Sequence, residues 1–103
     1  MAIDAGLVFK GSEEEFMVLV RDYIYSEQPE YSSITLKYCD KWIWVNFEAE
    51  YEGSLYLAVS FSKDFRQNEN EIERFIQEML ALGLINDEEI FDWDSYYASC
   101  QEK

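Results

Sequence analysis

Residues 33–62 read SITLKYCDKWIWVNFEAEYEGSLYLAVSFS, and this stretch decides the fold. Apolar and polar residues alternate through three runs in it, which is the period of a strand with one buried face. The runs cover residues 33–39, 42–51 and 54–62. They are separated by two short polar pairs, Asp40-Lys41 and Glu52-Gly53, which are typical of tight turns. We therefore predict an antiparallel meander of three strands.

The chain before this meander predicts one short strand and one helix. Residues 6–10 form an apolar run that Gly11 ends, so we expect an extended edge strand there. Ser12 followed by Glu15 is a capping box, and apolar residues at helical spacing come after it. We therefore predict a first helix over about residues 13–26.

Two further helices are predicted after the meander. The second helix carries an apolar stripe and ends before Gly83, which suits the left-handed position that closes a helix. The stripe consists of Ile72, Phe75, Ile76, Met79 and Leu80. A third helix is predicted over about residues 87–98, after the weaker capping pattern of Asn86 and Glu89. Residues 90–94 also alternate as a strand would, which leaves this last prediction open.

These elements follow one another in the order (β)αβββαα. An antiparallel sheet with helices on its apolar face is a two-layer α+β arrangement. A chain of 103 residues is one domain by length, and it is long enough to bury a single core. We therefore expect one acidic α+β domain over residues 1–103, with an antiparallel three- to four-stranded sheet and two to three helices.

The charge balance limits the classes of function that the chain can have. The chain carries 22 Asp+Glu against 8 Lys+Arg, a formal net charge of -14, and it has no histidine. A surface this negative repels nucleic acids and anionic lipid, and it attracts cationic proteins. The absence of histidine removes the commonest general acid–base group and the commonest transition-metal ligand. The composition therefore favours a protein that binds a basic partner protein, without direct nucleic-acid binding, membrane binding or enzymatic activity.

No catalytic, cofactor-binding or metal-binding residue is predicted, because the sequence has no glycine-rich phosphate loop and no Ser/His/Asp or Cys/His set. Cys39 and Cys100 lie far apart and are expected to be free thiols, with one disulfide as the alternative. The first residues lack both the basic start of a signal peptide and the length of a membrane span. We therefore expect a cytoplasmic protein.

The C-terminal segment is the first candidate for partner binding. Acidic and aromatic residues alternate there. Carboxylates pair with arginine, and aromatic rings add contact area and cation–π attraction. The candidate residues are Asp87, Glu88, Asp92, Trp93, Asp94 and Tyr96. The alternative is that these acids only stabilise the first turn of a helix.

A second candidate is the sheet face that the helices leave open. The residues of the 42–51 run that we expect to face the helices are Ile43, Val45, Phe47, Ala49 and Tyr51. The outward-facing candidates are Trp42, Trp44, Glu48 and, on the next strand, Tyr56. Large exposed aromatic patches mark interfaces. Two alternatives remain: the C-terminal segment or Phe9 covers this face, or the face is buried in a homodimer.

In size, acidity and α+β pattern, the chain resembles the small bacterial immunity proteins that neutralise nuclease toxins. It is also similar to the DNA-mimic inhibitors of phages and bacteria, which include anti-restriction and anti-CRISPR proteins. These resemblances cover the overall profile, and no residue carries over from them. The first implies a non-enzymatic toxin inhibitor, the antitoxin partner of a basic nuclease domain. The alternatives are a DNA mimic and a non-inhibitory interaction adaptor or homodimer.

Overall fold

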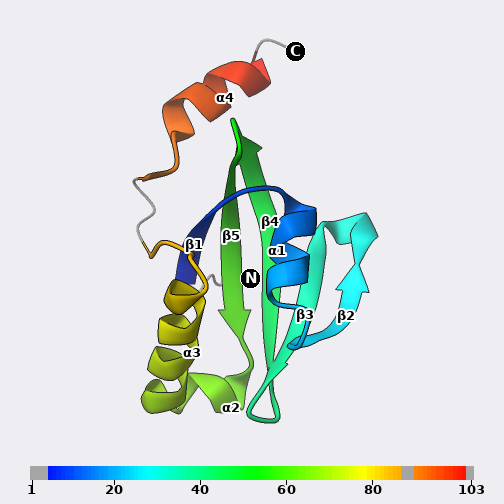
Figure 1. The fold of residues 1–103 in the computed structure, drawn as a ribbon, viewed down its shortest axis with the longest axis vertical. Coiled ribbons are helices and arrows are strands. Elements are labelled where there is room, and N and C mark those ends of the chain that lie inside the picture. The colour runs from blue at the N-terminus through cyan, green and yellow to red at the C-terminus, as the bar shows by residue number, and fades with distance from the viewer. Residues whose placement is uncertain (1–4, 87–89, 102–103) are drawn as a thin grey trace.

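The computed structural model describes residues 5–86 and 90–101, which form a five-stranded antiparallel sheet with helices (Figure 1). The strands are β1 (Ala5–Lys10), β2 (Ile24–Gln28), β3 (Ser33–Tyr38), β4 (Lys41–Tyr51) and β5 (Ser54–Phe61). The helices are α1 (Glu13–Leu19), α2 (Lys63–Arg66), α3 (Glu69–Ala81) and α4 (Trp93–Gln101), with a 3-10 turn η1 (Pro29–Tyr31). The strand order in the sheet is β1-β5-β4-β3-β2, so the predicted α+β class and antiparallel meander are confirmed.

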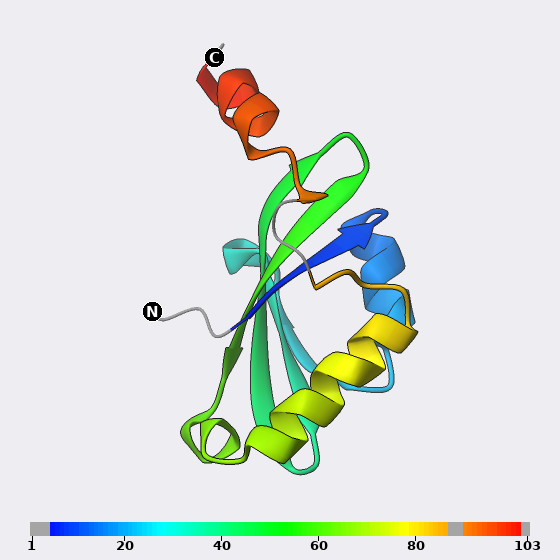
Figure 2. The same ribbon diagram turned by 90° about the vertical axis from the view of Figure 1, so that its left-hand side faces the viewer.

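The sheet has one covered face and one largely open face. Figure 2 shows α1 and α3 on the same side of the sheet, whereas α4 lies beyond one end of it. The predicted edge strand is also confirmed, because β1 pairs with β5 alone within the sheet. Its outer edge is partly closed by Ile85, whose N–H and carbonyl both bond to the backbone of Val8 at 2.8 and 2.9 Å. An edge strand covered in this way offers less backbone for unwanted pairing.

The prediction that the first helix reaches residue 26 is wrong. Helix α1 ends at Leu19, and the chain turns and enters β2, a strand that the sequence analysis missed. Tyr23 and Ile24 continue the apolar spacing of the helix, which is why the helix was predicted to continue. They are also aromatic and β-branched residues that fit a strand, and Ile24 pairs with Leu36 of β3. The tertiary pairing therefore overrides the local helical pattern.

Both turns of the meander are two-residue turns with positive φ angles. Cys39 and Asp40 have φ of 51° and 59°, and they connect β3 to β4. The first turn therefore lies one residue earlier than the predicted Asp40-Lys41. Glu52 and Gly53 connect β4 to β5 as predicted, with φ of 48° and 78°. Turns of this hand match the right-handed twist of the strands that they join.

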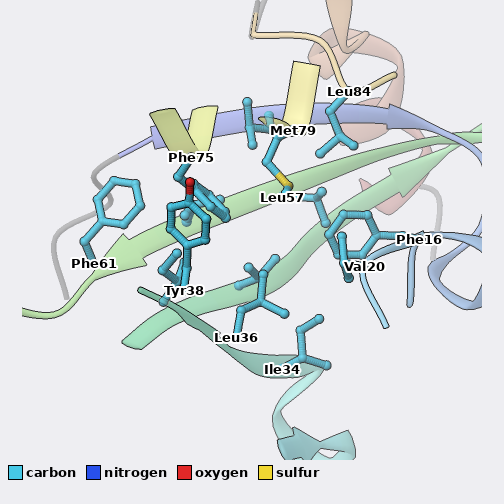
Figure 3. Packing of buried hydrophobic residues seen from close by; sticks show 14 of the residues in the cluster. Phe16, Val20, Ile34, Leu36, Tyr38, Leu57, Phe61, Phe75, Met79 and Leu84 are labelled. Carbon is cyan, nitrogen blue, oxygen red and sulfur yellow. The ribbon is translucent and has the colours of Figure 1, made fainter. Parts of the chain in front are cut away.

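The main core lies between the helices and the covered face of the sheet. Figure 3 shows Phe16 of α1 and Phe75 and Met79 of α3 turned toward the sheet, and all three side chains are buried. Tyr38 at the end of β3 packs 5.5 Å from Phe75 between ring centroids. Burial, followed by the charge of Glu78, raises the pKa of Tyr38 to about 12, so this phenol stays protonated at neutral pH.

A β-bulge in β4 moves the second half of that strand to the other face. The register shifts between Phe47, which is opposite Leu57, and Ala49, which is opposite Tyr56. The prediction that Ala49 and Tyr51 face the helices is therefore wrong. Ala49 is buried in a second cluster on the opposite face, and Tyr51 packs against that cluster. A bulge places two residues against one on the partner strand, which reverses the alternation beyond it.

Helix α3 has a defined start and a defined end. The side chain of Asn68 accepts a hydrogen bond from the N–H of Glu71 at 3.2 Å. At the other end, the N–H of Gly83 bonds to the carbonyl of Leu80, and the N–H of Leu84 bonds to that of Met79. Gly83 has a φ of +107°, and Leu84 is buried, as the predicted helix closure requires. This pair of bonds is the Schellman motif.

Replacing Gly83 with alanine should destabilise the fold by about 1 kcal/mol, because an L-residue resists positive φ. A Cβ at this position would meet no atom within 4 Å, so backbone strain and not a clash would cause the loss. Urea denaturation of Gly83→Ala measures the effect. Gly83→Asn is the matched control, and it should lose less because asparagine enters the left-handed region more readily. Equal losses in both variants would contradict this explanation.

Candidate protein-binding surface

The second hydrophobic cluster is aromatic, and it attaches the C-terminal segment to the sheet. We call Tyr56, Phe91, Trp93, Tyr96 and Tyr97 the aromatic cluster. The ring of Tyr56 lies 4.8 Å from Trp93, and Phe91 lies 4.6 Å from Trp93, measured between ring centroids. Aromatic pairs at these separations add to the burial of their area. No residue of α4 is itself buried, so its attachment depends on Phe91 and on the half-buried faces of Trp93 and Tyr96.

The prediction that Tyr56 is exposed on the open face is wrong. Tyr56 does lie on the face that the helices leave open, but only 5% of it is exposed, because Phe91 and Trp93 cover it. The alternative that the C-terminal segment covers this face therefore holds for one half of the face. Phe9 does not cover it, because Phe9 packs against Phe16 on the helical side.

Helix α4 begins later than predicted. It starts at Trp93, and the carboxylate of Asp92 accepts a hydrogen bond from the N–H of Ser95 at 3.1 Å. Asp92 is therefore the capping residue. Residues 87–89 lie outside the described residues. Three predictions involve them: the helix start at residue 87, the capping pattern of Asn86 and Glu89, and the candidates Asp87 and Glu88.

The charges of the sheet separate along its strands. The segment 33–63 is nearly neutral in sum, but its lysines and its glutamates lie at opposite ends of the meander. Lys41 begins β4 and Glu50 stands near its end, which is a separation of about 30 Å at 3.3 Å per residue. Figure 1 shows the β4–β5 hairpin at the end of the molecule where α4 lies. The glutamates of β4 therefore join the acids of the C-terminal segment.

Eight carboxylates of the described residues lie at or toward this end of the molecule, which we call the acidic end. They are Glu13, Glu14, Glu15, Glu48, Glu50, Glu52, Asp92 and Asp94. Glu13–Glu15 form the first turn of α1, and the preceding Gly11 donates its N–H to the carbonyl of Gly53 at 2.8 Å. The acidic start of α1 is thereby held against the turn of the β4–β5 hairpin.

The hairpin and the C-terminal segment also meet at the acidic end. Glu52 and Asp92 line the same hollow of about 230 Å³. Lys10 also lines this hollow and donates a hydrogen bond to Ser54 Oγ at 2.8 Å, and it is the cation that the described residues place there. A hydrogen bond to Cys100 is the main cause that raises the pKa of Tyr96, and the charge of Glu48 adds least. Helix α4 contacts β4, the strand that carries Glu48.

Basic residues lie at the opposite end, and there they are balanced by acids. The Lys41 ammonium lies 2.8 Å from the Glu71 carboxylate, and the side chains of both are 22% exposed. Lys37 lies 3.8 Å from Asp40. Helix α2 adds basic charge beside the start of β4, where the N–H of Ser62 bonds to the carbonyl of Trp42. Net negative charge is therefore concentrated at the acidic end.

The two candidate tryptophans lie on the open face, toward the end opposite the acidic end. Trp42 is half-buried, with the ring of Tyr25 at 4.5 Å and the ammonium of Lys37 at 5.5 Å from its own ring. Trp44 is 40% exposed. The structure therefore groups Glu48, Tyr56 and the C-terminal candidates together, and it leaves Trp42 and Trp44 farther along the same face. The C-terminal candidates in that group are Asp92, Trp93, Asp94 and Tyr96.

Sequence reasoning missed part of this surface, although a signal for it existed. Glu50 and Glu52 were not among the predicted candidates, and the acids of the first helix were not connected to this surface. Consecutive turns of an antiparallel meander lie at opposite ends of the sheet, so a residue just after one turn is far from a residue just before the next. That rule separates Lys41 from Glu50 without any structure.

Within residues 5–86 and 90–101, no three His, Cys, Asp or Glu side chains gather as metal ligands, and no helix has the length and apolarity to cross a membrane. Cys39 and Cys100 are exposed free thiols. One lies in the β3–β4 turn and the other in α4, so they occupy opposite ends of a molecule 43 Å long.

Removing the ring of Trp93 should release α4 while the sheet stays folded. Trp93→Ala removes the ring that packs against both Tyr56 and Phe91, and we expect a loss of about 2 kcal/mol, below that of a fully buried tryptophan. Hydrogen exchange should show lost protection in α4 and retained protection in β4 and β5. Tyr97→Ala is the control, because Tyr97 is 55% exposed. Equal loss of protection in the sheet would contradict this local attachment.

The cap of α4 should depend on pH. Hydrogen bonds from Ser95 lower the pKa of Asp92 below its usual 3.8. A lowered carboxyl pKa stabilises the folded form above pH 3.8, and this stabilisation is lost as pH falls through the lowered value. A carbon-detected NMR titration of Asp92 should give a pKa below 3.8, with the Ser95 amide signal moving in parallel. Asp92→Asn, which caps helices as well as aspartate, should abolish that movement.

A carboxyl pKa at or above 3.8 would show that the bond to Ser95 does not hold in solution.

No family model matches the chain, and no curated protein or solved structure is found to be similar to it.

Proposed function

We propose that this protein is a non-enzymatic inhibitor that binds a basic protein and blocks its functional surface, and that this partner is the nuclease domain of a toxin. The observation that supports the proposal is the acidic end, where the carboxylates of the β4–β5 hairpin and of the C-terminal segment lie beside the aromatic cluster. A nuclease must present a basic groove to bind phosphates. An acidic surface complements such a groove in charge, and its aromatic rings add contact area.

The binding mode follows from this combination. Long-range attraction brings the acidic end to the basic groove and raises the rate of association. Asp92 and Asp94 then pair with arginine or lysine side chains in place of substrate phosphates. The exposed edges of Trp93 and Tyr97 supply contact area at little cost in side-chain entropy. An inhibitor of this kind would protect the cell from within its cytoplasm.

A DNA mimic is the first alternative. That function requires carboxylates spread along an elongated surface, as phosphates are along a duplex. The molecule measures 43 × 26 × 26 Å, but Lys37 and Lys41 lie at the end away from α4. The uneven charge therefore favours an inhibitor that inserts one end into its partner.

An interaction adaptor or homodimer is the second alternative, and Trp44 is the observation in its favour. Its ring is 40% exposed on a sheet face whose neighbouring residues are mostly uncharged, such as Thr35 and Ser60. Binding through that patch would lose little affinity as salt rises. Binding through the acidic end alone would lose affinity steeply with salt.

Neutralising the acidic end should weaken capture of the partner at least about tenfold. The test uses tagged protein to capture basic proteins from an extract of the native host, followed by measurement of the dissociation constant of the purified complex. The variant Asp92→Asn with Asp94→Asn keeps the helix cap and removes two charges. We also expect the purified inhibitor to block the nuclease activity of the captured protein at equal molar ratio.

The matched control is Asp40→Asn with Asp64→Asn, which changes the net charge equally at the opposite end. Both pairs would weaken binding to the same degree if net charge alone attracted the partner. That result, or capture of proteins without nuclease activity, would contradict the proposal.

A further inference from the structure

A cavity of about 140 Å³ lies between α1, the end of β2 and the start of β3. Its apolar lining comes from Met17, Ile34 and Phe47. Ile34 is buried, and the ring of Phe47 is held edge-on by Phe16 at 6.0 Å between centroids. A water molecule needs only about 10–15 Å³ of such space, so the cavity can admit the end of a long side chain.

Two carboxylates complete this cavity. Glu13 comes from the first residue of α1, and Glu27 comes from β2, so the two belong to elements that are separate in sequence. No lysine or arginine is found among the described residues that line the cavity. The site therefore combines an apolar floor with two negative charges that have no cation beside them within the cavity.

We propose that this cavity receives an arginine side chain from the basic partner. The aliphatic stem would lie on Met17 and Ile34, and the guanidinium would lie between Glu13 and Glu27 against the ring of Phe47. Arginine fits better than lysine, because its planar group bonds two carboxylates at once, stacks on rings and gives up water more easily. The source of the arginine rests on the function proposed above, whereas the preference of the cavity does not.

The cavity is continuous with the acidic end, because Glu13 belongs to both. A partner that approaches the acidic carboxylates of α1 would therefore find a shaped site for one side chain next to a broad charged surface. Charged surfaces attract many basic proteins, whereas a cavity selects one side chain by shape. We infer that this cavity supplies part of the specificity that the charge alone cannot give.

The experiment titrates labelled protein with N-acetyl-arginine methylamide and follows backbone amide signals by NMR. We expect saturable shifts at Ser33, Ile34 and Phe47, with affinity in the millimolar range. N-acetyl-citrulline methylamide is the matched probe, because it has nearly the same shape without the charge, and it should cause no saturable shift. N-acetyl-lysine methylamide should bind more weakly than the arginine probe. Citrulline binding as tight as arginine binding would overturn the proposal.

Variants test the two carboxylates separately. Glu27→Gln and Glu13→Gln should each weaken the arginine probe about three- to fivefold, which is the upper part of the range for exposed ion pairs. Glu30→Gln is the control, since it removes one charge from the neighbouring η1 turn at a residue that does not line the cavity. Shifts spread over the acidic end, or an equal effect of all three variants, would show non-specific attraction and overturn the proposal.

This test separates the cavity from the proposed function. The Asp92→Asn and Asp94→Asn pair should leave probe binding unchanged, because neither residue lines the cavity. If the arginine probe does not bind the cavity, while the Asp92→Asn and Asp94→Asn variant still captures less partner, the present inference is refuted and the inhibitor function stands. If the probe binds the cavity but no basic nuclease is captured, the inhibitor function is refuted and the preference of the cavity for arginine stands.

Discussion

Strand β4 passes from one hydrophobic cluster to the other at the bulge between Phe47 and Ala49, and the C-terminal half of the molecule depends on that change of face. Without the bulge, Ala49 would point toward the helices, and glutamates would surround Tyr56 on the open face. With it, Ala49 joins Tyr56 and Val8 in an apolar site on which Phe91 and Trp93 settle. One extra residue in a strand thus creates the anchor for α4 and brings its acids beside those of the β4–β5 hairpin.

Local patterns predicted the parts of the fold that local interactions form. The capping box of Ser12 and Glu15 is present, with hydrogen bonds in both directions. The closure of α3 at Gly83 and the three strands of the meander follow from turn and cap chemistry, which a short stretch of sequence contains. Agreement between local preference and the final fold is what allows such elements to be predicted.

The parts that could not be predicted depend on partners distant in sequence. Strand β2 exists because Ile24 pairs with β3, although its own residues continue a helical pattern. The bulge was hidden because the 42–51 run alternates without interruption through Ala49 and Tyr51. For the candidate site, the sequence located the acids and rings of the C-terminal segment. It did not reveal that Tyr56 lies beneath them, because that contact joins residues separated by most of the chain's second half.

The separation of charge along β4 affects the electrostatic potential that an approaching protein meets in solution. At physiological ionic strength, the field of a charge decays over a Debye length of about 8 Å. Lys41 lies about 30 Å from the glutamates near the other end of β4, which is several Debye lengths. An approaching protein therefore experiences the potential of the nearer end alone, and the lysines do not cancel it. The molecule thus presents one negative end and one nearly neutral end, and a basic protein that meets the neutral end gains little electrostatic attraction and diffuses away.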